Sequence, residues 1–119
     1  YINDLFDLVY MRWFLHAMSY DNGVLVFRKA LQSLKKDGLV FIEVRSKNDL
    51  NLVKNSVYDK TDNSYTTTHK RWPYSKDMLT QMAVDNNCEI ISLDEGYFSF
   101  NNQTETNNPL LLRLILKKK

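Results

Sequence analysis

The chain has 119 residues, of which 44% are hydrophobic and 25% charged, and its formal net charge is +2. This length predicts one domain with a single core, and the composition is ordinary for a globular protein. So small a charge does not by itself indicate nucleic-acid binding, and a nucleic-acid partner is not expected. No apolar run approaches the roughly 20 residues that span a bilayer, so a membrane partner is not expected either.

Cys88 is the one cysteine of the chain, so no internal disulfide is possible and no metal site is expected. A single thiol fits a reducing cytoplasm, which is the predicted location. No signal-peptide pattern opens the chain. Because the sequence begins at Tyr1 without methionine, close to a predicted strand, we expect it to be a piece of a longer protein.

The first half of the chain predicts a strand, a helix and a second strand. Residues 5–11, LFDLVYM, are apolar apart from Asp7, which is typical of a strand buried on both faces. A helix follows, for which Asp21 or Asn22 is the predicted N-cap and Gly38 marks the predicted end. Residues 39–44, LVFIEV, form the next apolar strand. A helical crossover between the two strands makes them parallel.

The second half begins with a long polar segment, residues 46–74, in which only NDLNLVKN suggests a short helix. Such a segment inside a compact domain is typical of a functional loop or lid. Ser75 can cap a further helix, predicted over residues 76–87. Two strands follow, over 88–98 and 110–117, with a polar loop between them. Since no helix is predicted between these two strands, we expect them to be antiparallel neighbours.

Three segments carry a recognisable combination of features: FDLVYMRWFLHAM, ALQSLKKDGLVFIEV and HKRWPYSKDMLTQMAVDNNCEIISLDEGY. The first contains an Asp, an apolar pair and a Leu-His pair. In the second, a Leu-Lys run and a glycine precede the strand, and in the third a His-x-Arg element precedes the helix. Together they resemble the C-terminal half of the catalytic domain of class I S-adenosylmethionine-dependent methyltransferases. PLLLRLILKK resembles the family's final, antiparallel strand.

The resemblance implies an α/β fold, half of a doubly wound, mostly parallel Rossmann-like sheet with an antiparallel strand. The family's strand order is 3-2-1-4-5-7-6, so residues 1–119 would hold strands 4-5-7-6 as one half-domain, with a polar lid at 46–74. The family's Gly-rich cofactor turn has no counterpart, because the three glycines lie far apart: Gly23, Gly38 and Gly96. We therefore expect the cofactor-binding half to be absent from this chain or supplied by another.

The turn after the first strand is the expected cofactor site. In such sheets, ligands bind outside the carboxyl ends of the strands where the strand order reverses. The resemblance places Met11, Arg12 and Trp13 there as candidate ligands of S-adenosylmethionine. A guanidinium can hold a carboxylate by two parallel bonds, and an indole attracts a sulfonium. In the structural alternatives, Arg12 pairs with Asp7 or Glu43, and Trp13 fills the core.

Two histidines are the candidate catalytic residues. His16 stands at the Leu-His position, where it would act as a general base or, alternatively, stabilise the turn by bonding a backbone carbonyl. His69 is the second candidate base. Together with Arg71 in the lid and Arg45 at the end of strand 39–44, His69 is also a candidate for binding an anionic acceptor. The alternative for the lid residues is an ordinary exposed cluster.

The expected function is methyl transfer from S-adenosylmethionine to a small-molecule acceptor. A longer protein that contains this chain would carry out the reaction, and this chain alone is expected to be inactive. One alternative is a non-catalytic interaction module built on a methyltransferase-like half sheet. Another is a different doubly wound enzyme, such as a dehydrogenase, which the antiparallel final strand disfavours. The Asn-Pro-Pro-Tyr signature of some base methyltransferases is absent after the first strand, where MRWF stands.

The first strand also predicts a partner. An apolar strand with an unpaired edge exposes backbone donors and acceptors beside hydrophobic side chains, here Phe6, Leu8 and Tyr10. We therefore expect this strand to pair with a strand outside residues 1–119. That strand would come from the missing N-terminal half or from a second copy of the chain.

Overall fold

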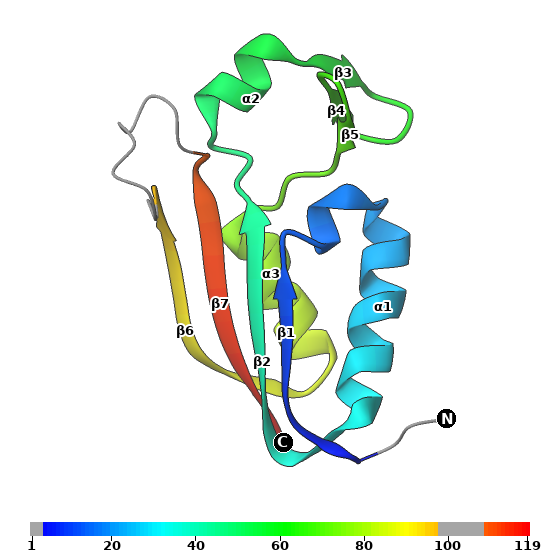
Figure 1. The fold of residues 1–119 in the computed structure, drawn as a ribbon, viewed down its shortest axis with the longest axis vertical. Coiled ribbons are helices and arrows are strands. Elements are labelled where there is room, and N and C mark those ends of the chain that lie inside the picture. The colour runs from blue at the N-terminus through cyan, green and yellow to red at the C-terminus, as the bar shows by residue number, and fades with distance from the viewer. Residues whose placement is uncertain (1–3, 98–108) are drawn as a thin grey trace.

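The computed structural model describes residues 4–97 and 109–119. Within them, four strands form one sheet in the order β1-β2-β7-β6: β1 (Phe6–Arg12), β2 (Leu34–Arg45), β7 (Leu111–Lys118) and β6 (Cys88–Gly96). β1 is parallel to β2, whereas β7 is antiparallel to both β2 and β6. The last two strands are therefore antiparallel neighbours, as the connection between them predicts (Figure 1).

The helix between β1 and β2, α1 (Tyr20–Ser33), begins earlier than the sequence predicts. Its N-cap is Ser19, whose hydroxyl accepts a hydrogen bond from the Asn22 amide at 3.4 Å. The predicted caps, Asp21 and Asn22, are therefore wrong. Both lie in the first turn, where an acidic side chain favours the helix N-terminus without capping it.

α1 also ends earlier than predicted, at Ser33. The chain continues directly into β2 because the Leu34 side chain is fully buried and its backbone pairs with Phe6. Gly38, the predicted helix end, instead lies in the irregular start of β2. A Cβ there would lie 2.8 Å from the carbonyl oxygen of Lys35, so the close approach of the backbone requires a glycine.

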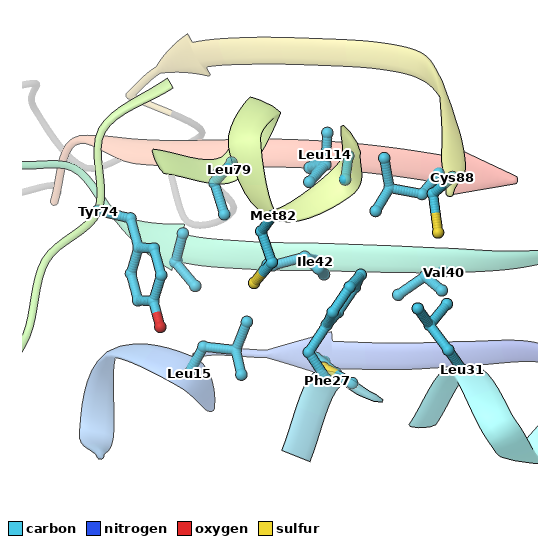
Figure 2. Packing of buried hydrophobic residues seen from close by; sticks show 14 of the residues in the cluster. Leu15, Phe27, Leu31, Val40, Ile42, Tyr74, Leu79, Met82, Cys88 and Leu114 are labelled. Carbon is cyan, nitrogen blue, oxygen red and sulfur yellow. The ribbon is translucent and has the colours of Figure 1, made fainter. Parts of the chain in front are cut away.

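The core lies between one face of the sheet and two helices, α1 and α3 (Lys76–Asp85). Alternate residues of the two central strands point into it, each no more than 2% exposed: Val40, Ile42, Val44, Leu112, Leu114 and Leu116. Phe27 and Leu31 of α1 and Leu79 and Met82 of α3 pack against them (Figure 2). Both helices therefore belong to one hydrophobic core on one face of the sheet.

The start of α3 is as predicted, since the Ser75 hydroxyl accepts a hydrogen bond from the Met78 amide at 3.1 Å. The helix ends at Asp85, before the predicted end at Asn87, which has a positive φ of 55°. The strand predicted over 88–98 is β6 as far as Gly96. Phe98 and the Asn-rich loop after it lie outside the described residues. No described helix is long and apolar enough to cross a membrane.

β1 is less buried than its sequence predicts. It lies at the edge of the sheet with β2 as its partner, and Phe6, Leu8 and Tyr10 are 47, 50 and 59% exposed. The prediction of a strand buried on both faces is therefore wrong for the described residues. The reason is that α1 and α3 both pack on the other face, toward which Met11 points.

Residues 46–74 are more regular than the predicted loop. They contain the expected short helix, α2 (Leu50–Asn55), and a small antiparallel sheet that the sequence did not indicate: β3 (Val57–Asp59), β4 (Ser64–Thr66) and β5 (Lys70–Arg71). Aspartate side chains hold its turns, since Asp59 accepts from the Thr61 amide and Asp62 from the Ser64 amide. Strands this short lack a visible alternation of apolar residues, which is why the prediction missed them.

Candidate functional site

The carboxyl ends of β1 and β2 lie at the same end of the sheet, because the two strands are parallel. There the chain forms a short 3-10 helix, η1 (Leu15–Ala17), and the segment after β2 rises into α2 and the small sheet (Figure 1). Three long-range backbone hydrogen bonds join these parts: Trp13 N–H to Glu43 O at 2.8 Å, Trp72 N–H to His16 O at 2.8 Å, and Tyr74 N–H to Arg45 O at 2.9 Å. This end of the sheet is the candidate site.

His16 lies at the centre of these connections and is 9% exposed. Its Nδ1 accepts a hydrogen bond from the backbone N–H of Arg45 at 3.0 Å, rather than donating to a carbonyl as the sequence alternative proposed. Burial, followed by the charges of Arg45 and Arg71, lowers the pKa of His16 to about 4, against a raising effect of Glu43. The imidazole is therefore neutral at pH 7, and since Nδ1 is an acceptor, the proton is on Nε2.

Two arginines lie close together beside His16. Arg45 Nε donates to Asp49 Oδ2 at 2.8 Å, and the Asp49 carboxylate, 1% exposed, also accepts hydrogen bonds from two backbone amides. Arg71 of β5 donates to the Thr67 hydroxyl at 2.9 Å. Burial and the nearby Arg45 charge both lower the pKa of Arg71. The two guanidinium groups therefore repel one another, and an anion between them would be stabilised.

A third arginine lies at the end of β1. The Arg12 guanidinium lies 5.0 Å from the ring centre of Trp13, and its Nε is 3.4 Å from Glu43 Oε1. Arg12 therefore forms the ion pair with Glu43 that was expected as the alternative to cofactor binding. Trp13 is 47% exposed and has a positive φ of 54°, so its ring does not fill the core. Backbone strain of this kind in a bulky residue is often found at functional sites.

The structure brings some of the predicted site residues together and leaves others apart. Contacts and electrostatic interactions connect His16, Arg45 and Arg71. Met11 is 5% exposed and belongs to the hydrophobic core. His69 is exposed at the end of the β4–β5 turn, where its carbonyl accepts from the Thr67 amide. Among the described residues, no group of His, Cys, Asp or Glu could hold a metal ion.

Two charged residues that pair with predicted strand-end residues were missed from the sequence: the buried Asp49 and the partly exposed Arg113. Asp49 could have been recognised as the N-cap of the short helix predicted in NDLNLVKN, because aspartate is a common N-cap residue. In the structure it caps α2 by accepting a hydrogen bond from the Leu52 amide. Arg113 could also have been recognised from the sequence, because it interrupts an otherwise apolar strand. Its Nε donates to Glu43 Oε2 at 2.8 Å, across 70 residues of sequence. A charge within an apolar strand predicts a partner, but its identity depends on the register of β2 and β7.

Comparison with known proteins supports the fold assigned to this chain. It superposes on a SAM-dependent methyltransferase from Methanosarcina mazei with a TM-score of 0.71 and 15% identity, covering 98% of this chain and 60% of that one. It is similar to a 1,6-didemethyltoxoflavin-N1-methyltransferase from Burkholderia thailandensis, determined with S-adenosylhomocysteine, with a TM-score of 0.71 and 12% identity, covering 98% and 45%. The [4+2]-cyclase SpnF is also similar, with a TM-score of 0.66 and 12% identity, covering 99% and 51%.

These similarities define a Rossmann-like, mixed α/β fold shared with part of the SAM-dependent methyltransferases. No protein family model and no curated protein sequence matches the chain. The chain spans less than two thirds of the length of the solved structures it resembles, for example 60, 54 and 63% of three of them and 39% of another. At identities this low the comparison shows the fold, and the presence of a cyclase among the similar structures means that the reaction requires separate evidence.

Proposed function

We propose that this chain is the acceptor-side half of an S-adenosylmethionine-dependent methyltransferase, with its four strands as strands 4-5-7-6 of the complete sheet. The observation that carries the proposal is the shared fold over 98% of the chain, combined with the basic cluster at the carboxyl ends of β1 and β2. Ligands of open α/β sheets bind at that end. The acceptor would be an anionic small molecule, and residues 46–74 would form the lid over it.

The described residues fit one part of the cofactor. Arg12, with a half-exposed side chain, would bind the carboxylate of the methionine group, and the exposed indole of Trp13 would contact the sulfonium. Met11 would contribute only through its backbone, since its side chain is buried. S-adenosylmethionine supplies an activated methyl group on a positive sulfur. No glycine-rich turn for its adenosine part is present, so that part requires residues outside this chain.

The two histidines would have different roles. His16 is neutral, and its Nδ1 is already bonded to the Arg45 amide, so it would position the end of β2 and present Nε2–H to an acceptor oxygen. This geometry supports a positioning role for His16 better than a role as general base. His69 is exposed on the lid and would act as the base, with Arg45 and Arg71 binding the acceptor's negative group.

The cofactor proposal is tested by calorimetry with S-adenosylmethionine and S-adenosylhomocysteine on the complete product of the gene that encodes residues 1–119. We expect binding, and we expect Arg12→Gln to weaken it. The matched control Lys54→Gln removes one positive charge from exposed α2 and should leave the affinity unchanged. Absence of binding by the complete gene product would contradict the proposal.

The acceptor site has an independent test on residues 1–119 alone, with inorganic sulfate as the probe. Nuclear magnetic resonance titration should shift the side-chain signals of Arg45 and Arg71. Arg71→Gln should abolish the shifts, and Lys54→Gln should not. Sulfate shifts confined to other residues would contradict an anionic acceptor at this end of the sheet.

The second candidate function is a non-catalytic interaction module. The observation in its favour is the exposed apolar surface of β1, where Phe6, Leu8 and Tyr10 are each about half exposed. This function would leave cofactor binding absent even in the complete gene product. The calorimetry described above therefore distinguishes it from methyl transfer.

A further inference from the structure

The basic cluster beside His16 contains one buried negative charge as well as its two positive ones. Asp49 is 1% exposed, and its carboxylate accepts a hydrogen bond from Arg45 Nε at 2.8 Å. Two backbone amides, those of Leu52 and Leu110, also donate to this carboxylate, at 3.2 and 3.1 Å. A buried carboxylate with one charged and two amide donors is well satisfied. The charge of Arg45 is therefore compensated inside the cluster.

Arg71 has a neutral partner instead. Its Nη1 donates to the Thr67 hydroxyl at 2.9 Å, and no carboxylate in residues 4–97 or 109–119 forms an ion pair with it. A guanidinium stays protonated at pH 7. The cluster of Arg45, Asp49 and Arg71 therefore has one net positive charge.

Backbone contacts hold the two arginines at one place. The Trp72 amide, next to Arg71, donates to the His16 carbonyl at 2.8 Å, and the Arg45 amide donates to His16 Nδ1 at 3.0 Å. His16 is neutral at pH 7, so it adds a hydrogen-bond donor to the cluster and no charge. Charged side chains around the cluster have partners of their own: Lys70 with Asp62, Glu43 with Arg12 and Arg113, Glu95 with Ser46 and Asn48, and Lys47 with the Tyr20 ring.

We propose that the group this cluster binds is the carboxylate of a monoanionic acceptor, rather than a phosphate or a sulfate. A guanidinium can hold any of these anions by two parallel bonds, so the geometry of Arg45 and Arg71 does not discriminate between them. Charge does, because a phosphate monoester carries about −1.5 to −2 charges at pH 7. The site is partly buried, with the Arg45 side chain 20% exposed, so the excess negative charge would be desolvated without a partner.

Asp49 would determine this selectivity without touching the acceptor, which makes it a positioning residue. It fixes the Arg45 side chain and compensates one of the two positive charges. The inference rests on the proposed function in one respect, namely that the bound carboxylate belongs to the methyl acceptor. The charge preference itself is a property of residues 1–119 and can be measured without cofactor.

The test compares three small anions by nuclear magnetic resonance titration of residues 1–119 at constant ionic strength, with the side-chain signals of Arg45 and Arg71 as the readout. Acetate and methanesulfonate are monoanions and sulfate is a dianion. Because methanesulfonate has the tetrahedral shape of sulfate, the effects of shape and charge are separated. We expect both monoanions to bind about fivefold more tightly than sulfate, the scale of one partly exposed charge pair. Tighter binding of sulfate, or no shift of these signals with any anion, would overturn the proposal.

Two variants raise the charge of the cluster by one unit and should invert this order. Asp49→Asn removes the buried carboxylate. Thr67→Lys adds a positive charge beside Arg71 at an exposed position, which covers the case in which loss of Asp49 disturbs the fold. Asp85→Asn, the same charge change at the exposed last residue of α3, is the matched control and should keep the wild-type order. A wild-type order in Thr67→Lys would contradict selection by net charge.

These titrations and the calorimetry with S-adenosylmethionine can fail separately. Cofactor binding by the complete gene product, together with a preference for sulfate, would refute the carboxylate inference and leave methyl transfer in place. A preference for monoanions without cofactor binding would refute methyl transfer and leave the charge selectivity in place.

Discussion

The buried His16 makes the stability of this fold depend on pH in a range where most side chains do not titrate. Its ordinary pKa of 6.5 falls to about 4 in the folded chain, chiefly because burial disfavours the charged imidazolium. The unfolded chain therefore takes up a proton at a higher pH than the folded chain. The neutral form stabilises the fold fully above pH 6.5, and this stabilisation is lost as the pH falls toward 4.

The size of the effect follows from the two pKa values. Linkage with pKa values of 6.5 and about 4 gives a loss of about 2 kcal/mol of unfolding free energy between about pH 7.5 and about pH 5. Protonation would also break the hydrogen bond in which Nδ1 accepts the Arg45 amide, since the imidazolium has no acceptor. Carboxylates contribute mainly below this range, so the interval isolates His16.

The measurement is urea unfolding of residues 1–119 at a series of pH values, followed by tryptophan fluorescence at low protein concentration. His16→Gln cannot titrate in this range, and its amide oxygen can still accept a hydrogen bond. It should lose the decline between about pH 7.5 and about pH 5. His69→Gln, at an exposed position, is the matched control and should keep it. An unchanged decline in His16→Gln would refute the assignment.

Three further predictions concern other parts of the molecule. Gly23→Ala should destabilise the fold by about 1–3 kcal/mol, because the added Cβ would lie 2.5 Å from the Tyr74 hydroxyl, and Tyr74→Phe in the same chain should recover part of the loss. Thermal unfolding of both single variants and the double variant measures this, and additive losses would contradict it. Residues 1–119 should bind S-adenosylmethionine weakly or not at all, as the glycine-rich turn is absent; micromolar affinity by calorimetry would show otherwise. Amides of residues 46–74 should exchange faster than those of β2 and become protected when an anionic acceptor binds, and protection equal to that of the sheet in the free chain would argue against a lid.

Local sequence signals determined most of the elements. The apolar runs near residues 5–11, 39–44 and 110–117 predicted strands β1, β2 and β7, and the Ser75 cap predicted the start of α3. The connection without a predicted helix correctly predicted the antiparallel pairing of β6 and β7. These features depend on residues close together in the sequence, so the pattern of side chains is sufficient to predict them.

The sequence predicted that Arg12, His16 and Arg45 would lie at one end of the sheet, but it did not predict their contacts. The carboxyl ends of β1 and β2 identified Arg12, His16 and Arg45 because parallel strands end at the same edge. The sequence could not show that His16 would accept a hydrogen bond from the Arg45 amide, or that its pKa would be lowered. That outcome depends on the burial of the ring and on the position of a backbone group 29 residues away.

Only the tertiary structure decided which charges meet and which surfaces remain open. Glu43 pairs with Arg113 because β7 runs antiparallel beside β2 in one particular register, and a shift by one residue would place Arg113 on the opposite face. Likewise, the apolar sequence of β1 predicted burial on both faces, but composition alone cannot show which elements cover a strand. The sequence determined that β1 is a strand, whereas the sheet order, with α1 and α3 on one face, decided that its other face and outer edge are exposed.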